Sequence, residues 1–220
     1  MLPVHSRTRG GTRTYTPAVA LTVLIVAIVM AVTIVDSRLA ARLVSEDGPI
    51  EWLQVVLFAG TAVITGQSAA REWADRRSRA PDVLLTAGFI VLAVSEMELP
   101  RHILGKSTKI SRLARDVSAG LPRETLFVLV VAGLAVGLGV YAFRFRAEVV
   151  TWVWSALGAA WGRLLLLGCS LLVLTELFER PLNRMGAGLP KPLLEESLEL
   201  LAALYCFLAM LRRRQDPDGY

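Results

Sequence analysis

The acidic side chains that could do chemistry in this 220-residue chain gather near the ends of its apolar segments. Carboxylates held close together in a low-dielectric setting share protons or bind cations, because their charges repel one another. Ionisable groups at membrane depth usually mark a functional site. We therefore predict an acidic pocket at one face of a helical bundle. Its candidate residues are Glu46, Asp47, Glu51, Glu96, Glu98, His102, Glu176, Glu196 and Glu199.

These acids differ in whether their expected position in a helix requires a stabilising partner. Glu96, Glu98 and Glu176 stand where a helix is expected to end, and there the helix dipole disfavours negative charge. A cation, a proton or a metal must then stabilise them. Glu51 and Glu196 stand at expected helix starts, where capping and the dipole favour acids without any ligand. A purely structural role therefore stays open for this second group.

The sequence contains few candidate ligands for a metal centre. Zinc sites usually need two or three His or Cys ligands, and His102 is the only histidine near the acids, because His5 lies in the polar N-terminal region. Glu98 and His102 are the candidate metal ligands, although His102 could equally be a hydrogen-bonded structural residue. Carboxylates alone could hold Ca²⁺ or Mg²⁺, so a divalent cation is the one cofactor that the residues suggest. Haem, nucleotide and iron–sulfur motifs are missing, and Cys169 and Cys206 lie inside apolar runs without redox spacing.

Apolar helices must position these residues. Hydrophobic residues make up 54% of the chain and charged residues 20%, with a mean hydropathy of +0.53. This composition is typical of a multi-pass membrane protein and excludes disordered, collagen-like and soluble nucleic-acid-binding classes. Each apolar segment must be a helix, because backbone groups in lipid have to bond internally. The six segments are 18–35, 52–70, 83–99, 125–143, 155–177 and 194–211.

The predicted fold is all-α, with one six-helix transmembrane domain over 18–211, a basic cytoplasmic tail over 1–17 and a C-terminal tail over 212–220. Basic clusters at 76–79 and 212–214 adjoin expected helix ends, which favours cytoplasmic termini. The preference for Arg over Lys indicates a GC-rich bacterial genome, so we expect a bacterial inner (plasma) membrane.

The prediction of an acidic pocket rests on the lengths of the uncharged runs. A span needs about 20 residues. The run 83–95 has only 13, and segments 155–177 and 194–211 each contain an uncharged run of only 12. Each of these helices reaches full length only by including its terminal acids, and all three sets of acids fall on the same side of the membrane. Arg163 lies inside segment 155–177, where it either snorkels to the cytoplasmic interface or pairs with a carboxylate or a lipid phosphate.

The loop between the third and fourth helices is predicted to contain a short amphipathic interfacial helix. Ile110, Leu113 and Val117 would share one face of it. Its basic side chains could contact phosphate or lipid headgroups, offset the acids, dock a partner or simply be solvated. They are Lys106, Lys109, Arg112 and Arg115.

Three motifs resemble those of a group of bacterial six-span membrane proteins, which open helix two with E-D-G-x-x-E-W. They are SEDGPIEWLQ (45–54), SEMELPRHILGKS (95–107) and LLEESLELLAAL (193–204). The resemblance covers most of the chain and implies the six-helix architecture and a shared acidic face, but no particular reaction. The residues matched by motif position are Glu46, Asp47, Gly48, Glu51, Trp52, Glu96, Glu98, His102, Glu196 and Glu199. The chain also loosely resembles membrane-embedded, metal-dependent lipid amidases, although it lacks the several histidines that bind zinc there.

Three functions follow as hypotheses. The first is a non-catalytic accessory subunit, or lipid- or ion-binding subunit, of a membrane assembly, with membrane lipids and other membrane subunits as partners and no nucleic acid. The second is a membrane-embedded metal-dependent hydrolase or transferase for a lipid or lipid-linked substrate, in which Glu96, Glu98 and His102 serve as metal ligands or general base. The third is a proton or cation path through Glu96, Glu199 and Arg163.

Overall fold

Every element in the described part of this computed structural model is a helix, which confirms the all-α prediction. The described residues are 48–74, 80–97, 122–184 and 191–215, with the isolated positions Ala20, Leu24, Ala27, Ile28 and Ala31. The helices are α3 (Pro49–Ala74), α4 (Ala80–Glu96), α7 (Pro122–Arg144), α8 (Arg146–Gly158), α9 (Ala160–Arg184) and α10 (Lys191–Gln215). Proline stands in the first turn of α3, α4, α7 and α10, where its missing N–H would have no partner in any case.

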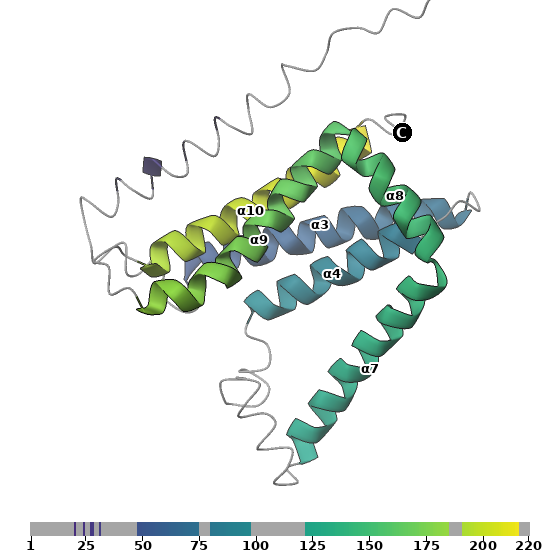
Figure 1. The fold of residues 1–220 in the computed structure, drawn as a ribbon, viewed down its shortest axis with the longest axis horizontal. Helices are drawn as coiled ribbons and strands as arrows, with labels where there is room; N and C mark the ends of the chain where they lie inside the picture. Colours follow the sequence, from purple (N-terminus) through teal and green to yellow (C-terminus); the bar gives the residue numbers. More distant parts are fainter. Residues whose placement is uncertain are drawn as a thin grey trace, which may run out of the picture.

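Four helices form the packed part of the molecule. Helices α3 and α4 form one antiparallel hairpin, α9 and α10 form another, and α10 also packs along α3 (Figure 1). Phe58 of α3 and Phe89 of α4 stack with ring centroids 6.4 Å apart in the core between these helices. These two rings are among the largest side chains that the core buries, so they contribute strongly to the packing of α3 on α4.

Small residues bring α9 and α10 close together. Ala202, Ala203 and Ala209 are fully buried on α10. A Cβ atom added at Gly168 of α9 would lie 2.7 Å from the Cys206 sulfur and 2.9 Å from the Ala202 carbonyl oxygen. Such contacts are typical of membrane helices, whose packing depends on close backbone approach.

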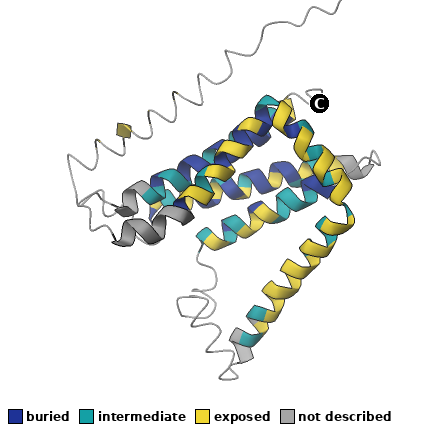
Figure 2. Cartoon of the chain, viewed as in Figure 1, coloured by how far each residue is buried: buried dark blue, intermediate teal, exposed yellow. Residues whose placement is uncertain are grey.

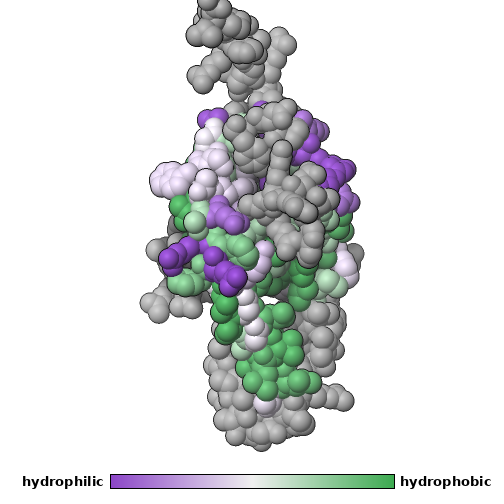
Figure 3. All heavy atoms as spheres, turned by 90° about the vertical axis from the view of Figure 1, so that its right-hand side faces the viewer, coloured by the Kyte–Doolittle hydropathy of each residue, from purple (hydrophilic) through white to green (hydrophobic). Residues whose placement is uncertain are grey.

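Helix α7 lies apart from this packed group, and most of its described residues are exposed (Figure 2). Leu129, Leu134 and Val136 are each more than 60% exposed. Figure 3 likewise shows a broad apolar surface on one part of the molecule, next to a region where hydrophilic atoms gather. Continuous apolar surface of this kind is normally covered by lipid or by another protein.

The structure supports a helical protein with at least one candidate membrane span, but it does not confirm the prediction of six spans. Among the described residues, one stretch, Pro49–Arg71 of α3, is long and apolar enough to cross a membrane. Helices α7 and α8, which differ in direction by 80°, would provide a second if they form one broken span. Helix α4 has 17 residues, and the apolar part of α9, Ala160–Thr175, is also short. Apart from the isolated positions, segment 18–35 lies outside the described residues, as does the loop helix predicted within 106–119.

The prediction of one continuous helix over 155–177 is wrong. Helix α8 ends at Gly158 and α9 begins at Ala160, because Ala159 between them is extended, with φ −85° and ψ 151°. Gly162 permits this sharp turn, since a Cβ atom there would lie 1.9 Å from the carbonyl oxygen of Ala156. Arg163 therefore lies in the first turn of α9, at a helix end rather than in a helix interior.

Candidate functional site

The acid-bearing helix ends lie together at one end of the packed group, which we call the acidic end (Figure 1). Helices α3 and α10 begin there, and their antiparallel partners α4 and α9 end there. Glu51 lies in the first turn of α3, and Glu96 is the last residue of α4. Glu196 and Glu199 lie in the early turns of α10. This arrangement follows from hairpin topology and agrees with the same-side placement expected from the sequence.

Gln54 joins α3 to α10 at the acidic end. Its side chain is fully buried, and its amide Nε2 donates hydrogen bonds to the backbone oxygen of Glu196 at 3.1 Å and to its carboxylate Oε2 at 3.2 Å. Glu51 and Glu195 both lie close enough to act electrostatically on the Glu196 carboxylate. The structure therefore brings together two of the predicted residues, Glu51 and Glu196, and adds Gln54, which the sequence analysis missed.

The other amide atom of Gln54 has no partner. Its Oε1 is a buried acceptor without a hydrogen bond among the described atoms. An unsatisfied buried acceptor costs about 1–3 kcal/mol, so this position favours an N–H donor, an O–H donor or a cation. The surrounding carboxylates add a preference for positive charge. A signal for Gln54 exists in the sequence, because it is a polar residue in an apolar run and follows Glu51 by three positions on the same helix face.

The remaining predicted site residues are placed only in part. Glu96 and Glu199 are half-buried at the acidic end. Several predicted residues, and the side chain of one more, lie outside the described part of the structure. They are Glu46, Asp47, Glu98, His102, Lys106, Lys109, Arg112 and Arg115, with the side chain of Glu176. Within the described ranges, no group of three or more His, Cys, Asp or Glu side chains is arranged to hold a metal ion. Glu98 and His102, the predicted metal ligands on which the hydrolase hypothesis depends, lie outside the described residues.

Arg163 lies far from the acidic end. It is exposed in the first turn of α9, which starts where α10 finishes. With α9 and α10 antiparallel, it stands about a dozen residues along the bundle from Glu199, a separation on the order of 20 Å at the helical rise. A proton or cation path that uses both residues would have to cross most of the bundle.

A buried ion pair occupies the end of the bundle opposite the acids. Both terminal nitrogens of Arg213 donate to the Asp82 carboxylate, with Nη2 3.0 Å from Oδ2 and Nη1 on Oδ1. The guanidinium carbon also lies 5.6 Å from the ring centroid of Trp152 and 5.2 Å from that of Trp161. The pair thereby connects α4, α8, α9 and α10. The sequence analysis assigned Arg213 to a basic surface cluster and did not predict this contact.

A comparison of the chain with protein-family models, with curated proteins and with solved structures finds no match. We therefore seek its function in the polar sites of the described helices. Buried polar atoms without a hydrogen-bond partner there are Gln54 Oε1 at the acidic end and the indole nitrogens of Trp152 and Trp161 beside the ion pair. At the acidic end this atom belongs to the side chain that bonds Glu196, one of the predicted site residues.

Proposed function

We propose that this chain is a small multi-pass protein of a bacterial inner (plasma) membrane that serves as a non-catalytic, cation-binding accessory subunit. The observation that carries the proposal is the buried Gln54 amide, whose nitrogen is bonded to Glu196 and whose oxygen has no hydrogen-bond partner among the described residues. Glu51 and Glu195 add negative charge near the Glu196 carboxylate. A bound cation would satisfy that oxygen and offset the repulsion between the carboxylates. The remaining helices would hold α3 and α10 in the required register.

The surface of the bundle supports the membrane location. Large apolar side chains are exposed on α3, α7, α8 and α9, as expected for residues that face lipid. Arginines stand at the ends of helices on the side away from the acidic end, at Arg71, Arg144 and Arg214. Lys and Arg are nearly as numerous in the segments on the acidic side, so the short basic clusters that adjoin helix ends, and not the totals, favour a cytoplasmic position for this basic end.

The donor set favours a hard, hydrated cation. Its groups are the amide oxygen of Gln54 and the carboxylate of Glu196, both oxygen ligands, and the charges of Glu51 and Glu195 act on the same carboxylate. Oxygen ligands suit Mg²⁺ and Ca²⁺, and Mg²⁺ usually keeps several of its waters and takes only one or two carboxylates from the protein. A cation held partly through water needs no ready-made cage of three carboxylates.

Replacing Glu196 with glutamine is expected to weaken the binding of Mg²⁺ or Ca²⁺ at least tenfold. The substitution removes the charge that faces Gln54 while keeping the size of the side chain. Removing a hydrogen-bonded charged partner costs about 1.5–3 kcal/mol, which corresponds to roughly a 10- to 100-fold change in Kd. Isothermal titration calorimetry of the purified full chain in detergent, with each chloride salt, measures this effect.

Two further variants make the result specific. Glu148→Gln removes one exposed carboxylate from α8 and should leave the affinity unchanged. Gln54→Leu removes the unsatisfied oxygen and should weaken binding as Glu196→Gln does. The proposal is wrong if the wild-type chain binds neither cation, or if Glu196→Gln and Glu148→Gln bind with equal affinity.

A further inference from the structure

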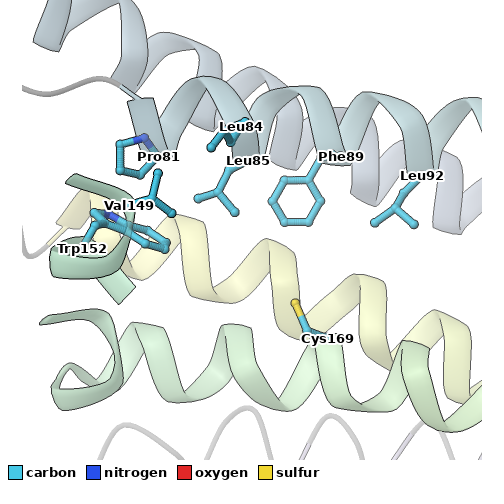
Figure 4. A pocket seen from close by; sticks show the side chains of 9 residues that line it. Pro81, Leu84, Leu85, Phe89, Leu92, Val149, Trp152 and Cys169 are labelled. Atoms are coloured by element: carbon cyan, nitrogen blue, oxygen red, sulfur yellow. The ribbon is translucent and has the colours of Figure 1, made fainter. Parts of the chain in front are cut away.

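An apolar groove with a cavity volume of about 270 Å³ runs along one face of α4, between this helix and α8 and α9 (Figure 4). Its α4 wall extends from Pro81 to Leu92 at helical spacing, which corresponds to about 16 Å along the helix axis. Across from this wall stand Val149 and Trp152 of α8 and Cys169 of α9. The groove is therefore long, narrow and lined almost wholly by hydrocarbon.

The shape and lining of the groove suit a single hydrocarbon chain as its occupant. The groove follows α4 for about 16 Å and is lined almost wholly by apolar side chains. One extended acyl chain is slender enough to lie along the α4 wall.

An exposed arginine lies one helical turn from the groove. Arg146 precedes the groove residue Val149 by three positions, so both lie on the same face of α8. The Arg146 side chain is exposed, and its guanidinium carbon stands 4.7 Å from the ring centroid of Phe143. Arginine forms strong, paired hydrogen bonds with phosphate oxygens. A charge on this face of α8 complements an anionic headgroup better than a wholly apolar partner.

We propose that this groove binds one acyl chain of an anionic phospholipid, with the headgroup phosphate held at Arg146. The proposal rests on the membrane location proposed above, but it does not depend on the cation site, whose residues lie on α3 and α10. The basic end of the bundle would face the cytoplasmic leaflet, whose anionic lipids are attracted to exposed arginines. The lipid would fill the space between α4 and α8 that protein side chains leave open.

Native mass spectrometry of the full chain, reconstituted with equal amounts of phosphatidylglycerol and phosphatidylcholine of the same acyl chains, tests the proposal. The groove variant is Gly88→Leu, because Gly88 lines the groove and an added Cβ there meets nothing within 4 Å. The matched control is Gly133→Leu on α7, where a Cβ is equally unobstructed. Arg146→Gln tests the headgroup contact separately.

We expect the wild-type chain and Gly133→Leu to retain phosphatidylglycerol with roughly a tenfold preference over phosphatidylcholine, equivalent to about 1.4 kcal/mol. Gly88→Leu should lose the bound lipid, and Arg146→Gln should retain lipid without the preference. Equal retention by Gly88→Leu and Gly133→Leu would overturn the proposal, as would a wild-type chain without any preference. Cation binding by Gly88→Leu should match that of the wild type, so failure of the lipid proposal and failure of the cation proposal give different results.

Discussion

Replacing Arg213 with methionine is expected to lower the free energy of unfolding by about 3–5 kcal/mol. The substitution leaves the Asp82 carboxylate, whose side chain is only 1% exposed, without the guanidinium that offsets its buried charge. It also removes the cation that lies against the rings of Trp152 and Trp161. Unfolding in mixed micelles with increasing denaturing detergent, followed by tryptophan fluorescence, measures the change.

The neighbouring arginine supplies the control. Arg214 is exposed at the end of α10, so Arg214→Met should change the free energy of unfolding by less than about 0.5 kcal/mol. Combining Arg213→Met with Asp82→Asn removes the unpaired charge and should recover part of the loss. Equal stability of the Arg213 and Arg214 variants would show that the ion pair does not hold the four helices together.

Alanine at Gly162 is expected to destabilise the protein by about 1–3 kcal/mol, as overpacking of a tight contact does. The added Cβ would lie 1.9 Å from the carbonyl oxygen of Ala156 and 2.4 Å from its carbonyl carbon. Both are backbone atoms that cannot rotate away, so the turn between α8 and α9 must open. This movement would separate Trp152 from Trp161, and thermal unfolding together with tryptophan fluorescence would detect both effects.

A glycine four residues earlier provides the comparison. Gly158 ends α8, and a Cβ added there meets nothing within 4 Å. Gly158→Ala should therefore be neutral, or stabilising by up to about 1 kcal/mol through its better helix propensity. If both alanine variants unfold at the same temperature, the close contact at Ala156 does not limit the turn.

Most helices could be predicted from the sequence because their signals are local. Apolar runs bounded by charges indicate α3, α4, α7 and α10, and proline stands in the first turn of each. The break at Ala159 carries no such signal, since neither proline nor a charged residue stands there. Glycine occurs in many unbroken membrane helices, so Gly158 alone does not indicate a turn. The break brings Trp152 and Trp161 together, with ring centroids 5.5 Å apart, and Gly162 close to Ala156, and neither contact is visible in the pattern of the sequence.

The site was predictable where it depends on helix ends and not where it depends on packing between distant segments. Glu51 and Glu196 could be placed near one another because both begin helices on the same side. Gln54 contacts Glu196 across 142 positions in the sequence, and Arg213 contacts Asp82 across 131. Each contact exists only because α10 packs beside helices from the first half of the described chain as well as beside its neighbour α9. Periodicity and charge counting describe single helices and cannot supply such pairings.

The separation of Asp82 from Arg213 has a consequence for biosynthesis. In the membrane topology proposed above, α4 would insert before the ribosome has made Arg213, which follows Asp82 by 131 positions. The Asp82 carboxylate would then stay hydrated at the membrane surface until α10 brings the guanidinium that offsets its charge. Burial of Asp82 would therefore wait for the arrival of α10.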